Sequence, residues 1–146
     1  MLTFQKERFS DIAPDLPPLF LRHFEEVAHD KDRISLAPDW EGYSMLEAAG
    51  RLHIITARDD GKLVGYFFAD IGYGLHNHTS LISGTDMFYL DPEYRKGLNG
   101  YRLLKTAIEG LEFDKMKIQT KIDRNLGRIF ERLGFRAAEI VYTRVK

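Results

Sequence analysis

The chain has 146 residues, 44% of them hydrophobic, which suffices for one domain, expected over residues 1–146, with a buried core. Its 21 Lys and Arg residues against 22 Asp and Glu residues give a net charge of -1, which argues against a general nucleic-acid-binding protein. It has no cysteine, which excludes disulfides, thiolate metal sites and thiol catalysis. No stretch reads as a membrane span or a signal peptide, so the expected location is the cytoplasm.

The first third of the sequence predicts a short strand and two helices. A strand is expected over residues 2–9. A helix is expected from Asp15, because the next positions carry prolines, which the first turn of a helix tolerates. Residues 29–41 read as an irregular acidic connection, and a second helix over 43–49 ends at Gly50. The first helix has an apolar side predicted to comprise Leu19, Leu21, Phe24, Val27 and Ala28.

The middle of the chain predicts strands joined by turns. Residues 52–57 and 63–71 are strand candidates, and Asp59-Asp60-Gly61 between them is a strong hairpin signal, because glycine adopts a positive φ at low cost. Residues 72–79 predict a second turn. A third strand follows over about 80–90.

The last part of the chain alternates helices with strands. Apolar residues recur at helical spacing over 100–111 and again over 126–133. Between them, residues 116–122 alternate apolar and polar side chains, which is typical of a half-buried strand. Residues 135–145 predict one or two final strands. This order predicts an α/β (α+β) fold, with a mixed, mostly antiparallel central sheet flanked by helices.

The stretch between the third strand and the 100–111 helix predicts an anion-binding site. Asp91-Pro92 ends the strand, and the next positions bring together two cations and two glycines just before the helix begins. A helix N-terminus offers unpaired N–H groups and the positive end of a dipole. These features suit a phosphate group.

Two motifs resemble the GNAT superfamily of acyl-CoA-dependent N-acyltransferases. Leu90-Asp-Pro-Glu-Tyr-Arg95, followed by glycines and a Leu-Leu helix, resembles the strand and pyrophosphate loop of that family. Asn125-Leu-Gly-Arg-Ile-Phe-Glu-Arg-Leu-Gly-Phe135 resembles the segment that ends near the acyl thioester. The interval between Arg95 and Asn125 leaves room for one helix and one strand, as in the family. The resemblance covers residues 50–146 and is that of a short member of the kind common in phages and prophages.

The resemblance implies an N-acetyltransferase that uses acetyl-CoA as cosubstrate and no metal. Its acceptor would be a primary amine on a small molecule or a protein. The thioester would lie between the strands at 86–90 and 116–122, with strand backbone pairing to the pantetheine arm and stabilising the oxyanion. The implied acetyl-CoA-binding residues are Phe88, Tyr89, Leu90, Arg95, Lys96, Gly97, Leu98, Asn99, Gly100, Tyr101, Asn125 and Phe130. Arg102 and Lys105 are further candidates for phosphate contacts.

The sequence departs from the family pattern at two positions. Leu98 stands where the loop has its first glycine, so we expect Gly97 to take the positive φ instead. Phe130 stands where the family often has a tyrosine that protonates the leaving thiolate. Either Tyr142 or Tyr89 takes over this role, or solvent does, since a thiol with a pKa near 8.5 can leave unprotonated.

Asp86 is the candidate general base. It shares a strand face with Phe88 and Leu90, and apolar neighbours would raise the pKa of its carboxyl group. The alternative is a strand-end aspartate bonded to nearby backbone. Asn125 likewise has an alternative as the cap of the last helix. His76 and His78 are read as turn residues, because two imidazoles without a third ligand make a poor metal site.

A second function from a different class stays open. Phe130 and Leu98 would also suit a GNAT-fold module that binds CoA or a partner protein but has lost turnover. The acidic and aromatic side chains of residues 29–41 would suit the binding of a cationic amine. The alternative is that these residues are an ordinary polar connection. The apolar C-terminal stretch is compatible with a homodimer. Neither nucleic acid nor a membrane is expected as a partner.

Overall fold

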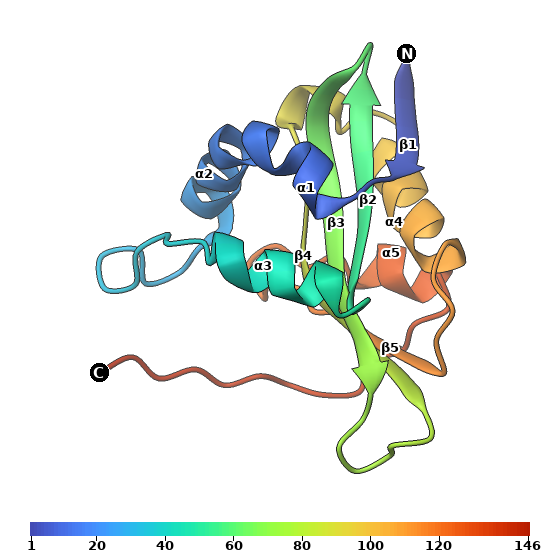
Figure 1. Cartoon of the computed structure of the whole chain (residues 1–146). Coiled ribbons are helices and arrows are strands. Elements are labelled where there is room, and N and C mark those ends of the chain that lie inside the picture. The colour runs from blue at the N-terminus through green and yellow to red at the C-terminus, as the bar shows by residue number, and fades with distance from the viewer.

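The fold is a five-stranded sheet covered by helices on both faces (Figure 1). The structure is a computed structural model that describes the backbone of residues 1–146 and every side chain except that of Asp86. In chain order the elements are β1 (Leu2–Lys6), α1 (Phe9–Ile12), the 3₁₀ helix η1 (Ala13–Asp15), α2 (Leu16–Val27), α3 (Trp40–Ala48), β2 (Leu52–Asp59), β3 (Lys62–Tyr73), β4 (Leu81–Leu90), the 3₁₀ helix η2 (Pro92–Tyr94), α4 (Asn99–Glu109), β5 (Lys115–Lys117) and α5 (Gly127–Arg132).

The strands lie in the order β1-β2-β3-β4-β5. The pairs from β1 to β4 are antiparallel, and β5 pairs with β4 in parallel. A parallel neighbour requires a crossover, which α4 supplies. The predicted mixed, mostly antiparallel sheet flanked by helices is therefore confirmed.

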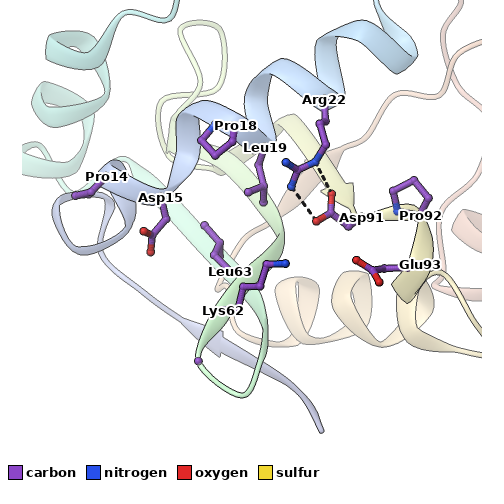
Figure 2. Close-up of a pocket in the computed structure, with 11 residues that line it drawn as sticks. Pro14, Asp15, Pro18, Leu19, Arg22, Lys62, Leu63, Asp91, Pro92 and Glu93 are labelled. Atoms are coloured by element: carbon purple, nitrogen blue, oxygen red, sulfur yellow. Dashed lines mark hydrogen bonds and ion pairs between the residues drawn. The ribbon is translucent and has the colours of Figure 1, made fainter.

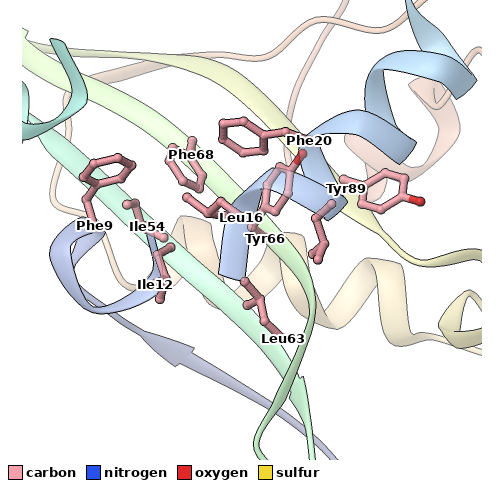
Figure 3. Packing of buried hydrophobic residues seen from close by; sticks show 10 residues of the cluster. Phe9, Ile12, Leu16, Phe20, Ile54, Leu63, Tyr66, Phe68 and Tyr89 are labelled. Atoms are coloured by element: carbon pink, nitrogen blue, oxygen red, sulfur yellow. The ribbon is translucent and has the colours of Figure 1, made fainter. Parts of the chain in front are cut away.

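Two hydrophobic clusters fill the space between the sheet and its helices. On one face, residues of α1 and α2 pack against Ile54, Tyr66 and Phe68 (Figure 3). On the other face, Leu103 and Leu104 of α4 and Phe130 of α5 form the second cluster. Figure 1 shows the same division, with α1, α2 and α3 on one side of the strands and α4 and α5 on the other. Alternate residues of the central strands serve the two clusters.

The tight turn between β2 and β3 has the conformation that its sequence predicts. Asp60 has a φ of 46° and Gly61 a φ of 88°. Two successive positive φ angles match the right-handed twist of a hairpin, and aspartate and glycine reach them at low cost. This turn sets the register of the two central strands.

The predicted apolar side of helix α2 is confirmed in part, since Leu19 is buried and Phe24, Val27 and Ala28 are half-buried. The buried residues of the helix are Leu16, Leu19 and Phe20, whereas 53% of Leu21 is exposed. Leu16, Leu19, Phe20 and His23 follow the i, i+3, i+4, i+7 spacing of one helix face, so the stripe includes a histidine. The prediction was wrong about Leu21, because it assigned this leucine to the buried face and left out His23.

The C-terminal third has less strand than predicted. β5 ends at Lys117, and the chain then turns, since the Thr120 hydroxyl donates to the Arg124 carbonyl oxygen at 3.0 Å and accepts from the Leu126 N–H at 2.8 Å. No strand forms over 135–145, and residues 136–145 run extended (Figure 1) and exposed. The prediction of strands at 116–122 and 135–145 was therefore wrong beyond Lys117.

No helix among the described residues is long and apolar enough to cross a bilayer.

Gly65 lies where β3 and β4 approach each other closely. A Cβ atom at Gly65 would lie 2.7 Å from the Tyr89 carbonyl oxygen and 3.1 Å from the Leu90 Cα. Because backbone atoms cannot swing aside, Gly65→Ala should lower the free energy of unfolding by about 1–3 kcal/mol, measured by urea denaturation. The matched control is Gly84→Ala in β4, since a Cβ there meets nothing within 4 Å. Equal stability of the two variants would contradict the close approach.

Candidate functional site

Strands β4 and β5 separate along the sheet and leave part of β4 open. β5 pairs only with Ile82, Ser83 and Gly84. The rest of β4 continues to Leu90 with β3 on one side and no described strand on the other. The register with β3 shifts between Phe68 and Ala69, just before this open half begins. A β-bulge of this kind bends a strand away from its neighbour.

The open half of β4 presents unpaired backbone groups. The Asp91 N–H donates to the Val64 carbonyl oxygen at 2.8 Å, so Asp91 faces β3. Pairing alternates along an antiparallel ladder, and Phe88 and Leu90 therefore direct their N–H and C=O groups away from β3. Only the Leu90 carbonyl oxygen has a described partner, the Nε of Arg95 at 2.7 Å. An extended amide chain could pair with the remaining groups.

The loop after β4 leads to a helix N-terminus with open space around it. Gly97 has a φ of 57°, so the predicted positive φ at this position is confirmed. A Cβ at Gly97 or Gly100 would meet nothing within 4 Å. The N-cap of α4 is Leu98, which makes no side-chain cap and is 65% exposed. Uncapped N–H groups beside free space fit a phosphate group.

The basic side chains near this loop differ in their surroundings. Arg95 turns towards α2, where its guanidinium forms two hydrogen bonds with Glu26 at 2.6 and 2.7 Å. Arg102 lies over the Phe4 ring of β1, 5.2 Å from its centroid. Lys105 pairs with Glu109 along α4 at 3.6 Å. Lys96 is exposed beside Gly97.

A second polar contact ties α2 to the end of β4. Arg22 donates to both carboxylate oxygens of Asp91 at 3.0 and 2.9 Å, and Asp91 is only 5% exposed (Figure 2). This ion pair borders a cavity of about 760 Å³, which adjoins the candidate site but is not lined by its open strand edge or glycine loop. The cavity lining comprises Pro14, Asp15, Pro18, Leu19, Arg22, Gly61, Lys62, Leu63, Asp91, Pro92 and Glu93.

His23 packs beside the open half of β4. Its ring stacks on Tyr89 with 4.9 Å between centroids, and its Nδ1 shares a hydrogen bond with the Tyr66 hydroxyl at 2.8 Å. Burial lowers the pKa of His23 from 6.5 to about 4, so the ring is neutral at pH 7. Burial, followed by the nearby Asp91 carboxylate, raises the pKa of Tyr89, which therefore keeps its proton.

The remaining predicted residues divide into those near the open edge and those away from it. Phe130 is buried and packs edge-on against Phe88, with 6.0 Å between ring centroids, so this position is apolar. Asn125 Oδ1 accepts from the N–H of Gly127, the first residue of α5, at 2.8 Å, while Leu126 occupies the N-cap position. Tyr142 is 89% exposed on the extended C-terminal segment and is not brought to β4 by packing. The side chain of Asp86 lies outside the described residues.

Nearer the loop, the Asn99 side chain donates to the Tyr94 carbonyl oxygen at 2.9 Å, and Tyr101 is half-buried in the first turn of α4. The sequence did not indicate the polar residues that α2 brings to this site, Arg22, His23 and Glu26. Glu26 lies four residues after Arg22 and three after His23, so its side chain neighbours each of theirs on the helix surface. That spacing was the available signal.

No family model and no curated protein sequence matches the chain. Solved structures do match it along its length. Glucosamine-6-phosphate N-acetyltransferase from Arabidopsis thaliana aligns with a TM-score of 0.72 and 11% identity, over 99% of this chain and 98% of that one. A predicted acetyltransferase from Clostridium acetobutylicum, solved with acetyl-CoA, aligns with a TM-score of 0.72 and 12% identity, over 99% and 96%.

An aminoglycoside acetyltransferase from an uncultured soil metagenomic sample, in complex with sisomicin, aligns with a TM-score of 0.68 and 15% identity, over 99% of this chain and 94% of that one. These proteins are acetyltransferases with the GNAT architecture. The chain has the GNAT fold. The fold that the two sequence motifs predicted is therefore confirmed. In this GNAT fold, the open edge of β4 and the glycine loop form the candidate site.

The buried His23 predicts a measurable dependence of stability on pH. Between pH 6.5 and about 4 the unfolded chain binds a proton at His23 that the folded protein does not, so the free energy of unfolding should fall as the pH falls through this window. His23→Gln removes this contribution, and its stability should approach or exceed that of the wild type at the acidic end. Urea unfolding at several pH values measures both curves. The matched control is His76→Gln in the exposed β3–β4 turn. Parallel curves for wild type and His23→Gln would contradict the prediction.

Proposed function

We propose that this protein is an N-acetyltransferase that transfers an acetyl group from acetyl-CoA to a primary amine by direct attack. The observation that carries the proposal is the open half of β4, whose outward backbone groups at Phe88 and Leu90 end beside the uncapped N-terminus of α4. An amide chain joined to a diphosphate matches both features at once. Acetyl-CoA is such a molecule.

Each part of the site has a distinct task in this reaction. The glycine loop holds the diphosphate through backbone N–H groups. The edge of β4 orders the pantetheine arm as an added strand, and a strand N–H near Phe88 stabilises the oxyanion that develops on the thioester carbonyl. Acetyl-CoA supplies the activated acetyl group. A neutral amine attacks its carbonyl carbon, the C–S bond breaks, and the electron pair leaves with the sulfur.

Three proton transfers accompany the reaction. The alkylammonium must lose one proton before it attacks, because its unperturbed pKa is near 10.4, and Asp86 is the proposed acceptor, directly or through water. The attacking nitrogen loses a second proton to solvent as the amide forms. The leaving thiolate gains one proton. Since Phe130 has no proton to give, Tyr89, Tyr142 or solvent supplies it. Of the two tyrosines, Tyr89 is a buried residue of β4, and Tyr142 lies on the exposed C-terminal segment.

The acetyl-CoA site can be tested with a substitution that fills it. A side chain at Gly100 meets nothing in the chain, so Gly100→Leu should leave the thermal stability unchanged or raise it. It should weaken acetyl-CoA binding at least about tenfold, because each lost charge-assisted hydrogen bond costs about 1.5–3 kcal/mol. Calorimetric titration measures the affinity, and Glu109→Leu at the far end of α4 is the control. Failure of the wild type to bind millimolar acetyl-CoA would refute the proposal.

Asp86 can be tested by a substitution that keeps its shape. Asp86→Asn should lower kcat/KM for amine acetylation by about 10²–10⁴-fold, the usual contribution of a general base. Acetyl-CoA affinity should stay close to that of the wild type. A structural aspartate would instead give a loss of thermal stability with little change in kcat, and that result would exclude the catalytic role.

A second function is favoured by one specific observation. Phe130 packs against Phe88, so the family's tyrosine position contributes only apolar surface. A module that binds CoA without transferring its acetyl group would share this feature. Acetyl-CoA binding without transfer to any of a panel of small-molecule and peptide amines would support it.

A further inference from the structure

Three charged side chains from separate parts of the chain meet at one point. Glu26 comes from the last turn of α2, Arg95 from the loop after η2, and Arg124 from the segment between β5 and α5. The Arg95 guanidinium contacts both carboxylate oxygens of Glu26 at 2.6 and 2.7 Å, and Arg124 contacts one of them at 2.5 Å. Only 18% of the Glu26 side chain is exposed.

This cluster stands at the end of the open strand edge. Arg95 also donates to the Leu90 carbonyl oxygen, and its guanidinium lies 5.3 Å from the centroid of the Tyr89 ring. Arg124 belongs to the chain that follows β5, across the gap from β4. Glu26 therefore links the two sides of the gap that the pantetheine arm would enter.

The charges of the cluster do not balance. Two guanidinium groups face one carboxylate, whose pKa Arg95 holds below its usual value, so Glu26 stays ionised and one positive charge remains in excess. The guanidinium fork that binds a carboxylate through two oxygens binds phosphate oxygens in the same geometry. Glu26 thus occupies a position that a phosphate group could take.

We propose that Arg95 and Arg124 form a phosphate-binding pair at the end of the open edge of β4, and that Glu26 is an internal anion which a diphosphate ligand displaces. This inference rests on the proposed use of acetyl-CoA. It assigns a ligand contact to Arg124 and a competing role to Glu26, in addition to the backbone groups of the glycine loop. The ligand class is a diphosphate, free or within acetyl-CoA.

An internal competitor lowers the apparent affinity of the ligand that replaces it. The apparent dissociation constant rises by the inverse of the fraction of molecules in which the arginines are free. Glu26→Gln removes the competing charge and keeps the size of the side chain. Ion pairs at partly exposed sites are weak, so this variant should bind acetyl-CoA about twofold to tenfold more tightly than the wild type. Arg124→Gln should bind it more weakly by a similar factor.

The experiment is a calorimetric titration of acetyl-CoA and, separately, of inorganic pyrophosphate into wild type, Glu26→Gln and Arg124→Gln. The matched controls are Glu25→Gln and Arg128→Gln, which change exposed neighbours and should bind both ligands like the wild type. Thermal unfolding without ligand checks that each variant is folded. If Arg124→Gln does not fold, Glu26→Gln alone decides the question.

The outcomes for this inference and for the proposed function can be told apart. Acetyl-CoA binding by the wild type, with unchanged or weaker binding by Glu26→Gln, would overturn the competing role of Glu26 and leave the proposed function intact. Absence of acetyl-CoA binding by the wild type would overturn the proposed function. The pyrophosphate titration then decides the arginine pair. Tighter binding by Glu26→Gln supports the pair, and equal binding excludes it.

Discussion

The candidate site depends on the loss of hydrogen bonding between β4 and β5 after three residue pairs. β5 pairs with β4 at Ile82–Gly84 and then turns away at Thr120, whose hydroxyl closes the turn. The outward N–H and C=O groups of Phe88 and Leu90 are left without a strand partner. Unpaired backbone groups are costly when buried, so such an edge must be hydrated or bound by a ligand. The sheet thereby acquires, beside β4, an open edge with which an extended molecule can pair.

Helix α2 determines the surroundings of that edge. Arg22 pairs with Asp91, His23 stacks on Tyr89, and Glu26 binds Arg95, so one helix face contacts β4 and the loop after it at three successive points. Two of these contacts are ionic, and one is a neutral histidine held against an aromatic ring. The helix therefore supplies charged groups at the end of the open edge and an uncharged surface beside the strand. Under the proposed function, this arrangement would separate the phosphates of acetyl-CoA from its acetyl group.

The proton chemistry follows from the same packing. Phe130 and Phe88 contact each other on the α5 side of the sheet, which leaves that side of the open edge apolar. Tyr89 points to the opposite face, where burial raises the pKa of its hydroxyl group. A proton donor for the leaving thiolate would therefore come from the α2 side or from solvent. In the proposed reaction, backbone groups would therefore contribute more than side chains do. This suits a reaction whose leaving thiol is already acidic.

The sequence by itself determined the order of strands and helices, the hairpin at Asp60 and Gly61, the positive φ of Gly97 and the GNAT fold, because each depends on local propensity or on a motif of adjacent residues. It missed the part of the buried face of α2 that includes His23, since a histidine does not look apolar until Tyr66 and Tyr89 surround it. It also predicted strands after Lys117 from local propensity, whereas the chain turns at Thr120. Only the tertiary structure decided that Glu26, Arg95 and Arg124 meet, because ion pairs between residues far apart in the chain leave no local pattern. Local interactions determined the elements, and long-range packing decided which charged side chains lie at the end of the open strand edge.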